Sequence, residues 1–220
     1  MPYKLLNLWV KILQYSRIVY RNIVTFMGVG VLVNLAPGAD VAFAMSCGLA
    51  GGTKKGAVAG LGVGLGVFFH IVLAALGVSA IVATFDGGLQ TLRLIGAAYL
   101  LYLAIRSWVA APITETYAIK APVLTIGQAF LRGALVNVLN PKPILFILAF
   151  LPQFIDPTAG PAAFQILYLG VIFATTGALI TAAYGAFAGR VARRLTPRLG
   201  LIHKATAVLL FGLAFQLVFL

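Results

Sequence analysis

Acidic side chains and cysteine are scarce in this chain of 220 residues, which carries 4 acids and one cysteine, Cys47. One cysteine excludes an internal disulfide, and one cysteine with 2 widely separated histidines does not supply the ligands of a zinc site. We therefore expect no metal and no cofactor. The paired carboxylates of an intramembrane protease are missing, as is a Gly-x-x-x-x-Gly-Lys loop for phosphate. The sequence thus argues against an enzyme and against an ATP-driven motor.

Apolar residues dominate what is present. The chain is 62% hydrophobic and 9% charged, with a mean hydropathy of +1.06. This composition predicts an all-α polytopic membrane protein, because the ten-residue alternating pattern of a membrane barrel is absent. Most of its apolar stretches are close to the length of about 20 residues that crosses a bilayer as a helix. About six segments are expected, at residues 23–49, 56–85, 94–110, 126–155, 162–188 and 205–220.

Positive charge is in excess, with 16 basic residues and a net charge of +12. In a soluble protein this excess would suggest nucleic acid, but here we expect the lipid bilayer as the partner, with basic loops facing the cytoplasm. The opposite loops carry Asp86 and Asp156, with Arg93 as their one basic exception. This pattern predicts that the C-terminus lies outside. The residues of the predicted cytoplasmic loops are Lys54, Lys55, Arg106, Lys120, Arg190, Arg193, Arg194, Arg198 and Lys204.

The first 22 residues alternate basic and apolar side chains. This pattern predicts a basic amphipathic helix over residues 1–22 that lies in the membrane interface, in preference to a cleavable signal. The next segment, 23–49, either crosses the membrane fully or bends back at Pro37-Gly38 as a re-entrant hairpin. The side of the N-terminus depends on which of these holds.

Two halves are visible in the chain. We expect a first membrane repeat at 23–111, a cytoplasmic linker at 112–124 and a second membrane repeat at 125–220. Val33-Asn34 followed by a proline in the first half recurs as Val136-Asn137 followed by a proline in the second. Three segments in each half would place the halves in opposite orientations, which is the inverted-repeat plan of many secondary transporters.

Small residues recur at helical spacing in two segments. Gly56, Gly60 and Gly64 follow every four residues, with Gly62 and Gly66 on an adjacent stripe. Such faces let helices approach closely, and they also leave open a role in sliding during a transport cycle. The fifth segment repeats the pattern with Ala174, Ala178, Ala182 and Ala186.

Asp40 is the one carboxylate within a long apolar stretch, directly after Pro37-Gly38. Proline removes a backbone donor and glycine permits unusual dihedral angles, so the first segment is predicted to break here and expose polar backbone groups. One interpretation is that Asp40 caps the half-helix that follows. The other is that it binds a cationic solute or exchanges a proton, since burial disfavours the charged form of a carboxyl group.

A second break is predicted in the fourth segment at Pro141-Lys142-Pro143. The nearby amides of Asn137 and Asn140 can replace lost backbone partners, and Asn34 holds the corresponding place in the first half. Lys142 either snorkels towards the nearer surface or serves as counter-ion to Asp40 or to a substrate carboxylate. If the two breaks meet, a zwitterion would find an acid from one half and a base from the other.

Two further residues have an open role. His70 follows Phe68-Phe69 on the glycine-rich helix and is either a hydrogen-bonded packing residue or part of a proton relay. Tyr99 either packs in the third segment or lines a cavity.

Several of these motifs resemble those of a known family. Pro37-Gly38-Ala39-Asp40, followed by a glycine-rich second helix, resembles the opening signature of the lysine exporter (LysE) family. Residues 140–154 are similar to its Asn-Pro-Lys element and its trailing Leu-Pro-Gln-Phe, and residues 95–103 resemble its third-helix motif. The match covers about residues 23 to 220. Ala39 stands where the family usually has a second proline, and the basic tail is additional.

The resemblance implies a secondary exporter of amino acids or related small metabolites in the bacterial inner membrane, exchanging them against protons. The site residues that it implies are Pro37, Gly38, Asp40, Asn140, Pro141 and Lys142. Two alternatives are a passive small-solute channel and a membrane scaffold or lipid-handling protein whose basic tail binds anionic headgroups. The sequence identifies neither the substrate nor the oligomeric state, and a homo-oligomer is compatible with it.

Overall fold

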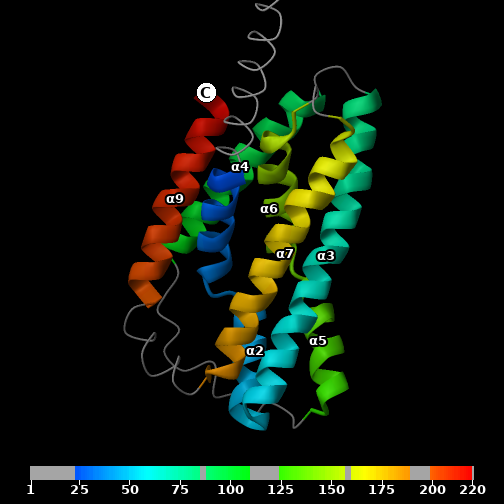
Figure 1. Cartoon of the computed structure of the whole chain (residues 1–220). Coiled ribbons are helices and arrows are strands. Elements are labelled where there is room, and N and C mark those ends of the chain that lie inside the picture. The colour runs from blue at the N-terminus through cyan, green and yellow to red at the C-terminus, as the bar shows by residue number, and fades with distance from the viewer. Residues whose placement is uncertain (1–22, 85–87, 110–123, 157–159, 189–198, 220) are drawn as a thin grey trace, which may run out of the picture.

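The described part of the chain is built from helices and short connections. The computed structural model describes residues 23–84, 88–109, 124–156, 160–188 and 199–219, which confirms the all-α class (Figure 1). Residues 1–22, Asp86, nearly all of the 112–124 linker and the basic residues 190–198 lie outside the described residues. The helices are Ile23–Leu35, α2 (Ala39–Gly51), α3 (Thr53–Thr84), α4 (Gly88–Val109), α5 (Ile126–Val138), α6 (Pro141–Phe150), the 3₁₀ helix η2 (Leu151–Phe154), α7 (Ala162–Ala186) and α9 (Leu199–Phe219).

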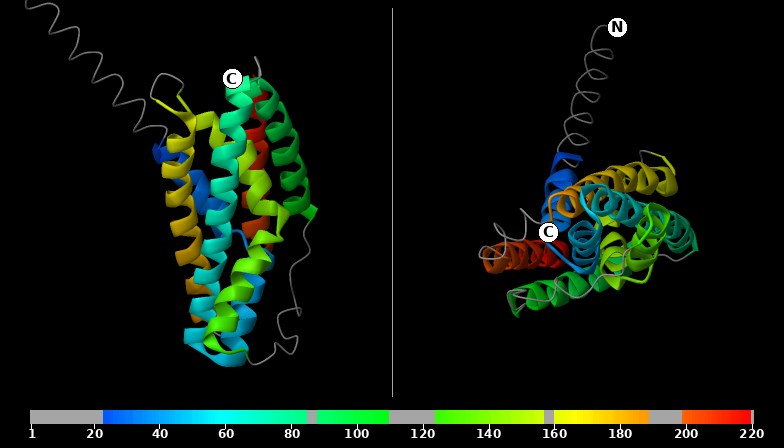
Figure 2. Two further views of the ribbon diagram at one scale, coloured as in Figure 1. Left: turned by 90° about the vertical axis from the view of Figure 1, so that its right-hand side faces the viewer. Right: turned by 90° about the horizontal axis from the view of Figure 1, so that it is seen from below.

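Both predicted breaks are present. Helix Ile23–Leu35 meets α2 at 54°, and α5 meets the continuous stretch Pro141–Phe154 at the same angle. Figures 1 and 2 show Ile23–Leu35 in one half of the molecule and α2 in the other. The chain therefore continues in one general direction through the first break, which favours a broken span over a re-entrant hairpin.

The described residues contain two helices that are long and apolar enough to cross a membrane, Thr53–Gly77 and Ala162–Ala186. Counting each bent pair as one span gives up to four. The helix Leu94–Val109 is apolar but shorter, and α9 extends over 21 residues. All six predicted segments thus contain helix, while six full crossings and the inverted repeat remain predictions.

Glycine and alanine set the spacing at the centre of the bundle, where α3 packs along α7 (Figure 2). A Cβ atom placed on Gly60 would collide with the backbone of Ala182, and one on Gly56 with the carbonyl group of Gly185. Gly66 on the adjacent stripe faces α5 in the same way. The packing interpretation of these small residues is confirmed, because a larger side chain has no space there. The sliding interpretation stays a prediction.

Aromatic rings fill the core on the Ile23 side of the two breaks. The ring centroid of Phe146 lies 5.1 Å from that of Phe150 and 5.4 Å from that of Phe173. Phe26 stacks on Phe150 with the ring centroids 5.8 Å apart. Stacked and edge-to-face pairs at such distances stabilise beyond their buried area. This cluster joins Ile23–Leu35, α6 and α7, and it closes the bundle beside the breaks.

We expect Gly60→Ala to lower the free energy of unfolding in detergent by about 1–3 kcal/mol, because the new methyl group overpacks against the α7 backbone. Gly77→Ala is the matched control, since it makes the same change in the same helix with nothing within 4 Å of the new Cβ. Thermal unfolding of both purified variants checks this. Equal stability of the two variants would contradict the close α3–α7 contact.

Candidate functional site

Asp40 lies in the first turn of α2, but Gly38 occupies the N-cap position of that helix. The prediction that Asp40 caps the half-helix is therefore wrong. Its carboxylate instead accepts hydrogen bonds from the second break: Nδ2 of Asn137 donates to Oδ2 at 2.9 Å, and Nδ2 of Asn140 donates to Oδ1 at 3.0 Å. These two contacts join the start of α2 to the second break.

Asn140 links the start of α6 to the first break. It is the N-cap residue of α6, where its Oδ1 accepts the backbone N–H of Lys142 at 3.0 Å. Pro141 occupies the next position, where a missing N–H costs nothing. Because the same side chain donates to Asp40 through Nδ2, the start of α6 is fixed relative to the first break.

Asn137 is fully buried and connects Asp40 to α3. Its backbone carbonyl accepts a hydrogen bond from Nε2 of His70 at 3.1 Å. It fits here because Gly66 has no side chain: a Cβ atom on Gly66 would lie 2.7 Å from that of Asn137. Within the described part of the chain, Oδ1 of Asn137 and Nδ1 of His70 are buried without a partner. Such atoms are rare in protein interiors and suit an internal water molecule.

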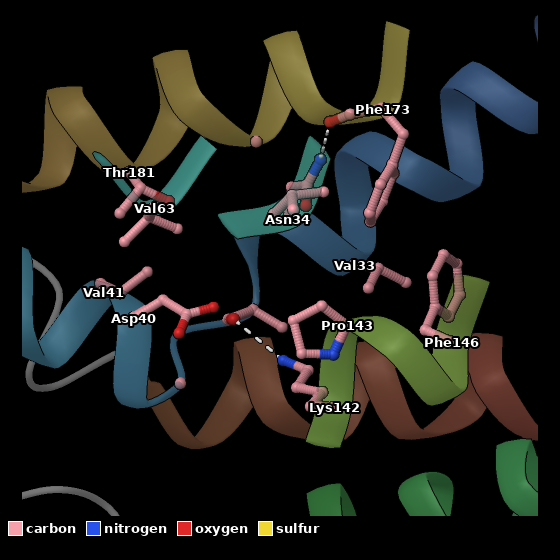
Figure 3. A pocket seen from close by; sticks show the side chains of 14 residues that line it. Val33, Asn34, Asp40, Val41, Val63, Lys142, Pro143, Phe146, Phe173 and Thr181 are labelled. Carbon is pink, nitrogen blue, oxygen red and sulfur yellow. Dashed lines mark hydrogen bonds between the residues drawn. The ribbon is translucent and has the colours of Figure 1, made fainter. Parts of the chain in front are cut away.

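The carbonyl groups freed by the first break find partners on other helices. The hydroxyl group of Tyr184 donates to the carbonyl oxygen of Leu35 at 2.9 Å. Nζ of Lys142 donates to the carbonyl oxygen of Ala36 at 3.4 Å, the bond drawn from Lys142 in Figure 3. Lys142 thus points towards the first break and does not snorkel to a surface. Backbone groups without helical partners need such donors inside a membrane, so α6 and α7 make the break tolerable.

Asn34 fastens the end of the first helix to α7. Its Nδ2 donates to the carbonyl oxygen of Phe173 and to Oγ1 of Thr176, both at 3.3 Å. Gly177 allows this close approach, because a Cβ atom there would lie 3.0 Å from the Asn34 side chain. Together with the Tyr184 bond to Leu35, Asn34 holds the end of the first helix against α7.

A cavity of about 50 Å³ lies between the two breaks, with room for a few water molecules. Asp40 and Lys142 both point into it, so one acid and one base face the same space (Figure 3). Apart from these groups and the polar Asn34 and Thr181, the walls are apolar. The lining residues are Val33, Asn34, Ala36, Gly38, Asp40, Val41, Val63, Val67, Lys142, Pro143, Phe146, Phe173, Gly177 and Thr181.

Most of the residues singled out from the sequence come together here. Asn34, Gly38, Asp40 and Lys142 line the cavity, Asn137 and Asn140 bind Asp40, and His70 joins through Asn137. Pro37 and Pro141 shape the breaks. Tyr99 is the exception: it pairs with Tyr102 at 5.9 Å on α4, which favours the packing interpretation. Among the described residues, no cluster of His, Cys, Asp or Glu side chains is arranged to hold a metal.

Sequence reasoning missed the contribution of α7. Thr181 lines the cavity and Tyr184 binds the first break, although both were treated as part of an apolar segment. The available signal was the position of these two hydroxyl groups among the small residues Ala178, Ala182 and Gly185. A polar atom on a helix face that packs closely against another helix needs a hydrogen-bond partner there.

Comparison with known proteins places these features in a family. The model of the LysE type translocator family matches residues 31–220. An uncharacterized membrane protein of Vibrio cholerae is 37% identical over 164 residues, covering 74% of this chain and 78% of its own. No solved structure matches the chain.

Two relatives have names that state a function. The homoserine/homoserine lactone efflux protein of Salmonella typhi is 34% identical over 163 residues, covering 73% of this chain and 77% of its own. The leucine efflux protein of Salmonella choleraesuis is 31% identical over 166 residues, covering 76% of each chain. The family consists of membrane transporters and not of enzymes. Because the family model covers most of its length, this chain belongs to the LysE type translocator family.

Proposed function

We propose that this protein exports small neutral amino acids, or close derivatives such as homoserine or its lactone, from the bacterial cytoplasm by exchange against protons. The observation that carries the proposal is the cavity between the two breaks, into which Asp40 and Lys142 both point. The efflux functions named for the relatives from Salmonella support the direction and the chemical class.

An acid and a base facing one cavity suit a zwitterion. Asp40 would bind the α-ammonium group of the substrate and Lys142 its α-carboxylate. Both groups are already close to partners that a substrate can replace: Lys142 makes a long hydrogen bond of 3.4 Å to Ala36, and Asp40 retains acceptor capacity beside its two amide contacts. The cavity has to widen to admit a whole amino acid, which agrees with a state between the inward-open and outward-open forms.

The apolar walls favour a neutral substrate side chain. Val63, Val67 and Phe146 face the space beyond the two charges, and Asp40 is the one carboxylate among the described lining residues. A second positive charge on the substrate would therefore be desolvated without a partner there, which is costly. The cationic solute also considered from the sequence is disfavoured for the same reason.

Proton exchange follows from how Asp40 is held. As a carboxylate it accepts bonds from Asn137 and Asn140, but a protonated oxygen no longer accepts an N–H in the same geometry. Protonation would loosen one of these amides and, with it, the tie between the two breaks. A proton and a substrate ammonium group would then compete for Asp40, which is the coupling that an antiporter requires.

The arrangement of helices supports an inverted repeat of 23–111 and 125–220. The second helix of one half, α3, packs on the second of the other, α7, and α4 packs on α9 in the same way. The start of α3, which carries Lys54 and Lys55, lies at the end of the molecule opposite the C-terminal end of α9 (Figure 1). Because positively charged loops face the cytoplasm, the C-terminus would lie on the outer side of the bacterial inner membrane.

We expect Asp40→Asn to reduce efflux driven by an imposed pH gradient by tenfold or more, because the amide neither carries the proton nor attracts the ammonium group. A tenfold loss corresponds to about one hydrogen bond to a charged group. Asp156→Asn, the same change near the end of η2 and away from the cavity, should retain the flux of the unmodified protein. Proteoliposomes loaded with labelled leucine or homoserine supply the measurement. Undiminished gradient-driven flux in Asp40→Asn would remove this acid from the mechanism. If the unmodified protein showed no counterflow of labelled substrate, it would be a channel and not an exporter.

Replacing Lys142 by methionine tests the carboxylate site. The wild type should prefer leucine to leucinamide, which lacks the carboxylate, by about tenfold in competition for counterflow. Lys142→Met should bind the two ligands equally, because the base that distinguishes them is gone. A preference that survives in the variant would show that another group binds the carboxylate.

A further inference from the structure

A groove follows the seam between α4 and α9, which lie side by side at one side of the bundle (Figure 2). Its lining residues form one helical stripe on each helix, from Leu94 to Trp108 on α4 and from Ala207 to Phe219 on α9. Phe211 lines both parts of the groove, which have volumes of about 310 Å³ and about 340 Å³. The two parts therefore form one groove, and at 1.5 Å per residue its α4 wall is roughly 20 Å long.

The lining residues of this groove are all apolar. Ala104 and Ala207 are buried and form its floor, whereas Trp108 and Phe211 are 57% and 56% exposed and form its walls. One half of the hydrocarbon core of a bilayer is about 15 Å thick, so the groove is long enough for the acyl chain of one lipid.

One end of the groove lies beside two cations. Nζ of Lys204 lies 5.9 Å from the centroid of the Trp108 ring, and Arg106 stands two positions before Trp108 on α4. Both basic residues are exposed, and neither α4 nor α9 contains an acidic residue. An anion for this end of the groove therefore has to come from outside the two helices. Tryptophan and basic side chains together are typical of the depth at which lipid headgroups lie.

We propose that this groove binds one phospholipid with an anionic headgroup. The headgroup phosphate lies against Lys204 and Arg106, and an acyl chain follows the α4–α9 seam past Phe211. The cationic end and the apolar length of the groove match the two parts of such a lipid. This inference does not rest on the proposed function, because it uses no residue of the central cavity.

A second copy of the chain fits the same groove less well. Two copies with the same orientation in the membrane, related by an axis along its normal, would bring Lys204 of each to the same depth. Their like charges would then face each other across the interface, which is unfavourable. An anionic lipid neutralises the same charges.

The first test uses the fact that the chain contains 2 tryptophans, Trp9 and Trp108. In Trp9→Phe the fluorescence comes from Trp108 alone, and bromine on a lipid acyl chain in the groove quenches it. The protein is placed in phosphatidylcholine vesicles that contain a small fraction of brominated phosphatidylglycerol or, for comparison, of brominated phosphatidylcholine. We expect quenching to show a preference of at least about fivefold for the anionic lipid, the effect of one basic residue near an anionic headgroup. Equal quenching by the two lipids would overturn the proposal.

Lys204→Gln in the same background should lower this preference by about fivefold, because one of the two cations is removed. Lys54→Gln is the matched control, since it removes an exposed lysine that does not line the groove. This control should keep the preference of its parent. If both variants lost the preference equally, anionic lipid would be attracted by the overall charge of the protein and not by this groove.

Native mass spectrometry after extraction with phosphatidylglycerol provides a second test. We expect one bound phosphatidylglycerol per chain, with the bound fraction reduced in Lys204→Gln and retained in Lys54→Gln. A lipid-free dimer whose Trp108 is shielded from both brominated lipids would overturn the proposal, because a second copy would then occupy the groove. Neither measurement requires transport, so a protein that binds the lipid but exports no amino acid would count against the proposed function alone.

Discussion

The carboxylate of Asp40 accepts hydrogen bonds from Asn137 and Asn140, and the rest of the site depends on these two contacts. They join a helix start in the first half of the chain to a helix break in the second. Each break exposes backbone groups that a membrane interior cannot hydrate. The second break supplies a donor to the first through Lys142 and the Ala36 carbonyl, while Tyr184 of α7 and His70 of α3 donate to the carbonyl groups of Leu35 and Asn137.

Close helix packing makes that exchange possible. Gly66 leaves the space in which Asn137 sits, and Gly177 lets α7 approach the Asn34 side chain at the end of the first helix. The small-residue faces therefore have a second effect beside association of helices. They place polar side chains of α5 and α7 against the breaks, so that packing and the chemistry of the site are set by the same residues.

Much of this arrangement follows from local sequence rules, and the remainder depends on partners distant in the chain. Proline located both breaks, with glycine beside it at the first, and a lone acid in an apolar stretch located the site. Of the two interpretations of Asp40, the capping of α2 is wrong, because capping propensity is local whereas its partners Asn137 and Asn140 lie about a hundred residues away. Tyr184 was missed for the same reason: its role arises only when α7 packs beside the first break.

A double-mutant cycle on unfolding in detergent measures the central contact directly. Asp40→Ala, Asn140→Ala and the double variant should give a coupling energy of about 1.5–3 kcal/mol, as expected for a hydrogen bond to a charged group. The cycle cancels the loss of the α6 cap, because both Asn140→Ala variants share it. A parallel cycle between Asp40 and Asn34, which line the same cavity without a mutual hydrogen bond, should be additive to within about 0.5 kcal/mol. Additivity in the first cycle as well would contradict the account that Asp40 joins the two halves.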